Sequence, residues 1–398
     1  MATIAPPAPP AQQIPTAAII TTMVRVSPQV SDLIFSPGRA PQVELSGQLT
    51  EVNIPEVGKL MPDAIHRIAA DLIGKNQSAQ QKLRENGSCD ISYSVSKVAR
   101  FRVNIFSQRG TLAIVMRVIP NSIPSFESLN LPPQLAEIAE LRNGIVLVTG
   151  PTGSGKSTTL AAILNKINLE KAYHIVTIED PIEFLHKHLK STIHQRELHS
   201  DTPSFALALR AALRQAPKVI LVGEMRDRET IEIAIEAAET GHLVFSTLHT
   251  IDASKTIERI VGVFPLSDQQ VIRTRFAKSF RYIVSQRLIP RKSGGRVAAI
   301  EILKSTMRTR EYVEKGEQEG KTLLDAMRDG STEGMQDFDG VIEQLIRGGV
   351  IDFEIGISYA SNMNNLRLQL SDAALGEQEP EPVTTPAAGR ETEIEIER

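Results

Sequence analysis

Glycine, lysine and hydroxyl side chains occur together in the segment 150–158, which reads GPTGSGKST. Its glycines let the backbone turn tightly, so that its N–H groups can point inward at an anion. Its lysine supplies a positive charge for the β- and γ-phosphates, and the following serine supplies a hydroxyl ligand for Mg²⁺. The segment therefore predicts a P-loop for ATP and Mg²⁺, formed by Gly150, Pro151, Thr152, Gly153, Ser154, Gly155, Lys156, Ser157 and Thr158, with Ser157 as the metal ligand.

A second candidate follows the apolar run VILV at residues 219–222, where Gly223 and Glu224 come next. P-loop ATPases place a carboxylate opposite the γ-phosphate at the end of such a strand. We expect Glu224 to orient the attacking water and to accept its proton. Gly223 occupies the position where an aspartate usually precedes that glutamate, so indirect contact with Mg²⁺ must come from another residue.

Two further segments carry titratable groups at strand ends. In TIEDPIEF (177–184), Glu179, Asp180 and Glu183 cluster where ligands of parallel sheets bind, and they are candidates to complete the Mg²⁺ shell or polarise the water. An exposed, solvated turn is the alternative for this cluster. In ETGHLVFSTLHT (239–250), His249 follows a strand and is a candidate to sense the γ-phosphate, with ordinary packing equally compatible. His242 precedes that strand and is expected to be structural.

These residues need strands and helices in alternation to bring them together. The apolar strand GIVLVTG (144–150) runs into the P-loop, and a helix is expected from about Lys156. Strands alternating with helices predict a mostly parallel α/β sheet that is covered on both faces. The expected strands are HIVTIE (174–179), VILVGE (219–224) and LVFSTLH (243–249), and the expected helices include SFALALRAALRQ (204–215) and RETIEIAIEAAET (228–240).

A smaller α/β domain is expected before this sheet. It has a helix over 63–75 and three strands at CDISYSV (89–95), ARFRVNIF (99–106) and TLAIVMRVI (111–119). In the middle strand, Arg100 and Arg102 share one face because side chains alternate. The chain is thus divided into a Pro/Ala-rich disordered tail (1–22), an N-terminal domain (23–120), a linker (121–133), an ATPase domain (134–298), a C-terminal helical region (299–372) and a disordered acidic tail (373–398).

Composition excludes several classes of protein. The net charge is −3, and residues 376–398 alone contribute −5, so the rest of the chain is nearly neutral. A nucleic-acid-binding protein is usually more basic, so no nucleic acid is expected. The single cysteine, Cys89, excludes an intrachain disulfide and a cysteine-rich zinc module. No apolar run is long enough to span a bilayer, and no signal peptide is recognisable, which favours the cytoplasm.

The four segments, in this order, resemble Walker A, an acidic box, an atypical Walker B and a histidine box of the secretion and type IV pilus motor ATPases. The match is best with the twitching-motility (PilT/PilU-like) branch and extends from about Ser31 to Ile351. The resemblance implies a PAS-like N-terminal domain, a RecA-like ATPase domain and a C-terminal helical region. It also implies a homo-hexameric ring that hydrolyses ATP, works on an inner-membrane pilus platform protein and withdraws pilin subunits.

Four arginines are candidates for contacts with phosphates or with another subunit. The resemblance implies that Arg102 and Arg117 reach the phosphates from the N-terminal domain, and surface arginines are the alternative. Arg210 and Arg214 lie four residues apart on one helix, so they share a face. They are candidates for a subunit interface, although surface salt bridges are slightly favoured.

Some positions depart from the branch pattern and leave alternatives open. Ile34 replaces the usual histidine, 307–316 differs from the usual retraction segment, and SQRLIPRK (285–292) and NNLRLQL (364–370) are similar to the accessory retraction paralogue. The leading prediction is the retraction motor. The alternatives are an accessory (PilU-like) ATPase, an assembly or secretion ATPase, a nucleotide-dependent regulatory module and, least favoured, a nucleic-acid translocase.

Overall fold

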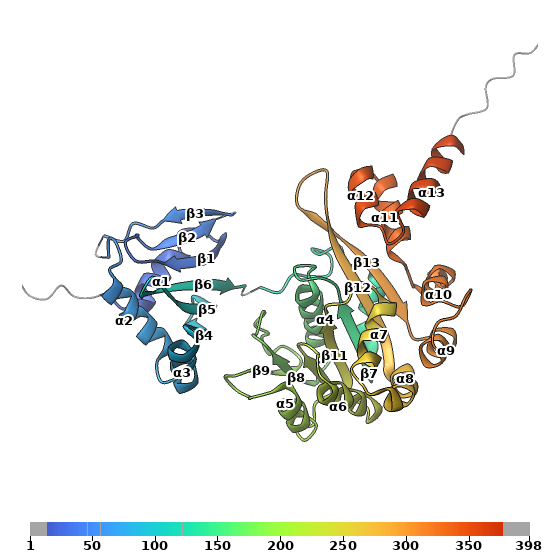
Figure 1. Ribbon diagram of the computed structural model, residues 1–398, viewed down its shortest axis with the longest axis horizontal. Coiled ribbons are helices and arrows are strands. Elements are labelled where there is room, and N and C mark those ends of the chain that lie inside the picture. Colours follow the sequence, from blue (N-terminus) through green and yellow to red (C-terminus); the bar gives the residue numbers. More distant parts are fainter. Residues whose placement is uncertain (1–13, 46, 56, 121, 377–398) are drawn as a thin grey trace, which may run out of the picture.

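The computed structural model describes residues 14–45, 47–55, 57–120 and 122–376 of the chain. They form two α/β domains, each built around its own sheet, and a helical region at the C-terminal end (Figure 1). The predicted fold class is confirmed. In the part of the chain that the structure describes, none of the helices combines the length and hydropathy that crossing a bilayer requires.

The N-terminal domain holds a six-stranded antiparallel sheet in the order β3-β2-β1-β6-β5-β4. Phe101, Val103 and Ile105 of β5 point into the core, whereas Arg102 is exposed, as the alternation predicts. Its elements are α1 (Thr16–Val24), β1 (Val30–Phe35), β2 (Gln42–Leu45), β3 (Gln48–Glu51), α2 (Pro62–Ile73), α3 (Gln77–Asn86), β4 (Ser88–Val95), β5 (Ala99–Gln108) and β6 (Thr111–Ile119).

The N-terminal boundary at residue 23 is wrong, because helix α1 belongs to this domain. Ile19, Ile20 and Met23 of α1 are buried in its core, and the Thr16 hydroxyl donates a hydrogen bond to Asp71 of α2 at 2.6 Å. Because prolines precede Thr16, the sequence pattern does not predict this short apolar helix, whose buried side chains pack against the rest of the domain. Residues 16–22 therefore belong to the N-terminal domain and not to the predicted tail. Residues 1–13 lie outside the described residues.

The second sheet has seven strands in the order β13-β12-β7-β11-β10-β8-β9, all parallel except β13. Side chains of β7 alternate between two cores: Ile145 and Leu147 pack on one face, and Val146 and Val148 on the other. The central strands of this sheet are largely apolar because both faces of the sheet are buried. The strands are β7 (Gly144–Thr149), β8 (His174–Glu179), β9 (Thr192–Glu197), β10 (Val219–Val222), β11 (Leu243–Leu248), β12 (Phe280–Pro290) and β13 (Arg296–Lys304).

Helices cover both faces of this sheet and then extend beyond it. The predicted ATPase-domain boundary at residue 298 is wrong, because it cuts through β13, which pairs with β12 up to Lys304. The helical elements are η1 (Pro133–Glu140), α4 (Lys156–Glu170), α5 (Phe205–Ala212), α6 (Arg228–Glu239), α7 (Ala253–Gly262), α8 (Leu266–Ser279), α9 (Met307–Lys315), α10 (Leu323–Asp329), η2 (Ser331–Glu333), α11 (Phe338–Arg347), α12 (Phe353–Tyr359) and α13 (Met363–Gly376).

The C-terminal region is helical, as predicted. Phe338 and Ile342 of α11 pack against Val297 and Ala299 of the β12–β13 hairpin. Helix α13 continues to Gly376, so the predicted acidic tail begins later than residue 373, and residues 377–398 lie outside the described residues.

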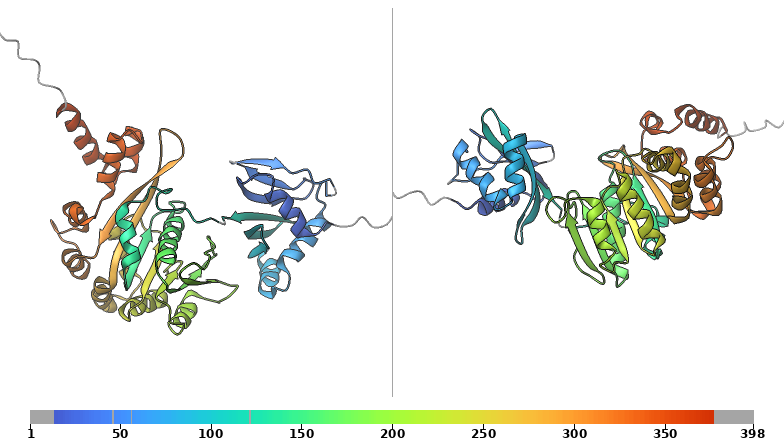
Figure 2. Two further views of the ribbon diagram at one scale, coloured as in Figure 1. Left: turned by 180° about the vertical axis from the view of Figure 1, so that it is seen from behind. Right: turned by 60° about the horizontal axis from the view of Figure 1, so that its bottom comes forward.

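The two domains lie side by side, with the C-terminal helices at the far end of the second one (Figure 2). The segment between β6 and η1 connects them. Strand β9, an edge of the second sheet, faces the N-terminal domain, and Glu197 at its end contacts Ser92 of β4 and Arg100 of β5. The edge of the parallel sheet is thus the place where the two domains of one chain meet.

Candidate active site

The loop between β7 and α4 is tightly curved. Gly150 has φ +143°, and a Cβ atom there would lie 2.4 Å from the Gln286 carbonyl oxygen. Only glycine fits this position, because β12 approaches the loop backbone so closely. Gly155, with φ +88°, then leads directly into α4. The loop thus presents the amino end of a helix and its N–H groups to one point.

The Lys156 side chain crosses this loop. It is 8% exposed, and its Nζ donates hydrogen bonds to the carbonyl oxygens of Gly150 at 2.9 Å and Pro151 at 3.1 Å. Burial lowers the pKa of Lys156, and the charges of Glu224 and Glu183 partly oppose that shift. The lysine is thus a desolvated cation held by neutral carbonyls, an environment in which an anion would be strongly attracted.

A cavity of about 540 Å³ opens beside the loop and collects residues from four separate segments. Its lining includes Thr152, Gly153, Gly155, Lys156, Ser157, Thr158, Glu179, Glu183, Glu224 and His249. Pro151 and Ser154 line a neighbouring cavity on the other side of the loop. The carboxyl ends of parallel strands β7, β8, β10 and β11 meet at this edge of the sheet, which explains the gathering.

Glu224 lies between two cationic or polar neighbours. Its Oε1 is 2.5 Å from Arg226 Nε, and its Oε2 is 3.6 Å from His249 Nε2. A Cβ atom at Gly223 would lie 3.2 Å from the Ile178 carbonyl oxygen, so the backbone of β8 crowds any larger side chain. A side chain at this position would therefore require the two strands to move apart by a few tenths of an ångström. A carboxylate in this position can accept a proton from a water held near the P-loop.

Glu179 is held by the protein itself. Its Oε1 accepts hydrogen bonds from the Thr177 hydroxyl at 2.6 Å and from Gln195 Nε2 at 3.0 Å. Burial raises the pKa of Glu179, although these hydrogen bonds oppose the shift. Glu183 lines the same cavity. Of the two, Glu183 is the one whose carboxylate has no hydrogen bond to a described side chain, so it is the freer of the two acids.

The two histidines of the fourth segment have different surroundings. His249 faces Glu224 and lines the cavity. His242 Nδ1 lies 2.9 Å from the Ala237 carbonyl oxygen, which ties it to the end of α6. This hydrogen bond agrees with a structural role for His242.

The singled-out arginines lie away from this cavity within one chain. Arg117 Nε is 3.0 Å from Asp32 Oδ1, and Arg102 lines a different cavity, between the two domains, together with Asp180. Arg210 forms a surface ion pair with Glu229 at 2.7 Å, and Arg214 lines the same charged groove. Any contact between Arg102 or Arg117 and a phosphate therefore requires another arrangement of domains or another subunit.

Sequence reasoning missed three residues that shape the site. Gln286 of β12 donates through Nε2 to the Ser154 carbonyl oxygen, although the two residues are far apart in sequence. Gln195 anchors Glu179 from the next strand, and Arg226 pairs with Glu224. Only Arg226 had a signal, since it lies two positions after the glutamate. The two glutamines become visible only when the strand order is known.

The chain is similar to a known protein family and to several characterised bacterial proteins. The family model described as type II/IV secretion system protein matches residues 42–335. The type IV pilus retraction ATPase PilT of Pseudomonas aeruginosa is 43% identical over 324 residues, which are 81% of this chain and 92% of that protein. The twitching motility protein of Neisseria gonorrhoeae is 43% identical over 82% of this chain and 86% of its own length. PilU of P. aeruginosa is 37% identical over 85% and 87%.

Solved structures agree with these relatives. The crystal structure of the pilus retraction motor PilT with bound ADP superimposes with a TM-score of 0.80 at 41% identity, and covers 89% of this chain and all of that one. The ATPase DotB of Legionella pneumophila gives a TM-score of 0.75 at 27% identity over 92% of this chain and 98% of that one.

Proposed function

The chain belongs to the type II/IV secretion system protein family, and from this membership we propose that it is a motor ATPase that powers type IV pilus retraction. The observation that carries the proposal is the single cavity shared by the P-loop, Glu224 and His249. Three segments that are distant in the sequence meet there, and each supplies one part of an ATP hydrolysis site. The relatives with the names PilT and twitching motility protein supply the link to the pilus.

The residues act on ATP by position and charge. The γ-phosphate takes the place of the Gly150 and Pro151 carbonyls as the partner of Lys156, because a phosphate oxygen attracts the ammonium group more strongly than a carbonyl does. Glu224 then orients water for in-line attack and accepts its proton. His249 lies close enough to Glu224 to respond when the γ-phosphate leaves.

Mg²⁺ fits the residues at this site. Within the described residues, no cluster of three or more histidine, cysteine or acidic side chains is arranged to hold a metal alone. Mg²⁺ usually takes one or two protein oxygens and completes its shell with phosphates and water. The Ser157 hydroxyl, with Glu179 or Glu183 nearby, offers such a partial shell. When bound, Mg²⁺ supplies positive charge to the β- and γ-phosphates.

Arg102 and Arg117 are proposed to complete a site from the N-terminal domain. They lie directly opposite each other on β5 and β6. Like charges in this position repel each other, and the Asp32 carboxylate, 3.0 Å from Arg117 Nε, offsets part of that repulsion. An exposed pair of guanidinium groups on rigid strands suits the charge that develops on a γ-phosphate during transfer.

The remaining parts of the proposal concern assembly. We propose a homo-hexameric ring in the cytoplasm, held at the inner membrane by the pilus platform protein. A paralogous retraction ATPase is a further candidate partner. The identity to PilT, 43%, exceeds that to PilU, 37%, which favours the principal over the accessory motor.

Deletion of the gene tests the function. We expect surface pili to accumulate while surface motility is lost, because pili are extended but not withdrawn. Loss of pili would indicate an assembly ATPase instead. Normal pili and motility would contradict any role in the pilus. Turnover measured on the purified protein with and without DNA separates a motor from a regulatory module and from a translocase.

A further inference from the structure

Glu197, at the end of β9, is a buried carboxylate outside the nucleotide cavity. Its side chain is 4% exposed. A charge removed from water in this way is costly unless several donors surround it. The donors around Glu197 come from both domains, so this residue lies where the two halves of the chain meet.

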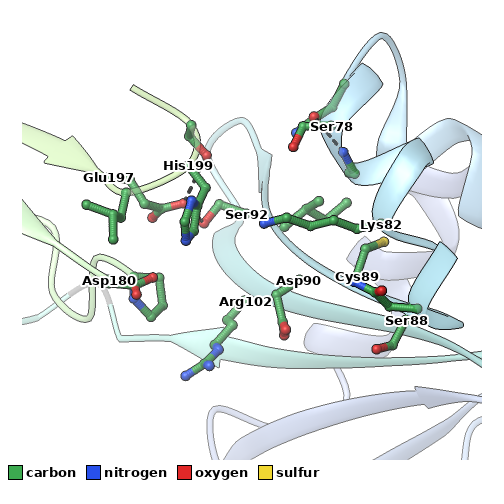
Figure 3. A pocket seen from close by; sticks show the side chains of 17 residues that line it. Ser78, Lys82, Ser88, Cys89, Asp90, Ser92, Arg102, Asp180, Glu197 and His199 are labelled. Atoms are coloured by element: carbon green, nitrogen blue, oxygen red, sulfur yellow. Dashed lines mark hydrogen bonds between the residues drawn. The ribbon is translucent and has the colours of Figure 1, made fainter. Parts of the chain in front are cut away.

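The N-terminal domain supplies two of these donors. Arg100 of β5 forms an ion pair with Glu197, with Nη2 2.9 Å from Oε2, and the hydroxyl of Ser92 on β4 donates to Oε1. Figure 3 shows Glu197 and Ser92 facing each other across the boundary, with Asp180 beside them. Among the ion pairs of the described residues, Arg100–Glu197 is the one that joins the two domains.

The second domain supplies two further donors, the Ser200 hydroxyl, 3.4 Å from Oε1, and the acidic segment of the nucleotide site. The backbone N–H of Ile182 donates to the same Oε2 atom at 3.1 Å. Ile182 immediately precedes Glu183, which lines the nucleotide cavity. One carboxylate oxygen therefore ties the loop that carries the acids to the strand that carries Arg100. Arg102 lies two residues further along that strand, on the same face.

A polar cavity of about 420 Å³ lies at this contact, between the two domains. Arg102 lines it from the N-terminal domain, and Asp180 lines it from the other (Figure 3). Ser92 and Glu197 line the same cavity, so the contact between the domains forms part of its wall.

We propose that Glu197 is a positioning residue that latches the N-terminal domain of each chain to its own acidic loop and so sets the rate of ATP turnover. The proposal rests on the proposed ATPase function. Loss of the latch frees the loop 180–183, which carries Glu183 to the nucleotide cavity, so that loop occupies its place beside the P-loop less often. Turnover falls, whereas ATP affinity, which depends on the P-loop, stays near normal.

The test uses the full-length ring and two independent measurements. Cysteines introduced by Gln48→Cys and Glu258→Cys, both at exposed positions on different domains, carry a donor and an acceptor dye. Cys89 is buried and competes little for the dyes. Labelled chains are diluted with an excess of unlabelled ones, so that the distance distribution reports one chain. ATP affinity and turnover are measured on the same preparations.

We expect Glu197→Gln to broaden the interdomain distance distribution and to lower kcat about fivefold, with KM for ATP changed less than about twofold. Arg100→Ala should have the same effects as Glu197→Gln. The double variant should differ little from either single variant, because the two residues share one interaction. Arg39→Ala is the matched control, since it removes an exposed ion pair with Glu51 in the same domain. It should leave both measurements unchanged.

Each result is decisive. An unchanged distance distribution in Arg100→Ala and Glu197→Gln would overturn the latch. A broadened distribution with normal kcat would overturn its role in turnover. If Glu197→Gln fails to fold, the same two measurements are made on Arg100→Ala and Ser92→Ala, which remove the partners of Glu197 in the N-terminal domain. Failure of the proposed function is separate, since it would appear as absent ATP turnover in the unmodified protein whatever the distances show.

Discussion

At the level of single residues, the ammonium group of Lys156 has only neutral hydrogen-bond partners, so a phosphate would stabilise it further. Its ammonium group is buried against two carbonyl oxygens, and burial already lowers its pKa. We expect Lys156→Ala to abolish ATP hydrolysis and to weaken ATP binding strongly, because the charge directed at the phosphates is lost. Binding by calorimetry and phosphate release measure the two effects.

Lys166→Ala provides the control for that variant. Lys166 lies on the same helix, pairs with Glu170 and does not line the nucleotide cavity. It should bind and hydrolyse ATP normally. Turnover near the normal rate in Lys156→Ala would refute the assignment of the site.

The role proposed for Glu224 is tested by an isosteric change. Glu224→Gln should keep ATP binding but lower turnover by about 10²-fold or more, because an amide cannot accept the proton of the attacking water. Single-turnover hydrolysis of bound ATP is the measurement. If the variant hydrolyses ATP normally, the base is another acid, and Glu183 is the next candidate, since Thr177 and Gln195 already hold Glu179.

Glu301 makes a pH-dependent contribution to stability. It is 3% exposed on β13, its Oε1 accepts a hydrogen bond from the Ala253 N–H at 2.9 Å, and burial raises its pKa from 4.5 to about 7. Between these two values the folded chain binds more protons than the unfolded one. The contribution is therefore complete below pH 4.5 and is lost as the pH rises through 7.

Glu301→Gln should flatten this decline, by an amount on the order of 3 kcal/mol, because the amide stays neutral at every pH. Denaturant unfolding between about pH 5 and pH 8 measures the free energy of unfolding. Glu258→Gln, at an exposed position, should keep the slope of the parent protein. An unchanged slope in Glu301→Gln would show that Glu301 ionises normally in the folded chain.

At the scale of elements, strands β5 and β6 aim two arginines off one sheet. Arg102→Ala and Arg117→Ala should bind ATP with near-normal affinity and hydrolyse it about tenfold more slowly, a change of about 1.4 kcal/mol in the barrier. The reason is that guanidinium groups stabilise the charge of the transition state more than that of bound ATP. Steady-state turnover and equilibrium binding give the two numbers.

Mixed rings show which subunit the arginine serves. When Lys156→Ala chains are mixed with Arg102→Ala chains, recovery of activity would show that an arginine acts on the site of a neighbour. Full activity of both single arginine variants would leave these residues as surface groups and would contradict their proposed role at the phosphates.

Local patterns predict strands β4 to β8, β10 and β11 because each of these strands is either alternating or apolar throughout. The strands over 111–119 and 174–179 and the helix from Lys156 agree with the structure to the residue. Both strands of the β12–β13 hairpin were missed. Helix α1 was missed because prolines precede a short apolar segment.

The same reasoning accounts for what could be found of the site. The P-loop and Glu224 are recognisable because each lies at the end of an apolar run. The hydrogen bonds of Gln195 and Gln286 were not predictable, because they depend on which strands become neighbours. Likewise, the close approach of the Ile178 carbonyl to Gly223 depends on the packing of β8 against β10 and was not predictable.

At the scale of the whole molecule, the account requires that chemistry at one edge of a sheet move a second domain. The nucleotide cavity lies at the carboxyl end of the strands, and the N-terminal domain meets the same sheet at β9 through Glu197. A loop of only a few residues, 180–183, lies between the two. The nucleotide cavity and the N-terminal domain are therefore separated by only this short segment.

The most direct test of the central claim is to watch individual pili in living cells. Pili labelled with a fluorescent dye are followed by video microscopy in cells whose only copy of the gene carries Glu224→Gln. The account predicts that pili still extend, that retraction events become rare, and that the unmodified gene restores them. Normal retraction in cells with the Glu224→Gln copy, or loss of extension instead, would contradict the claim that ATP hydrolysis by this chain powers retraction.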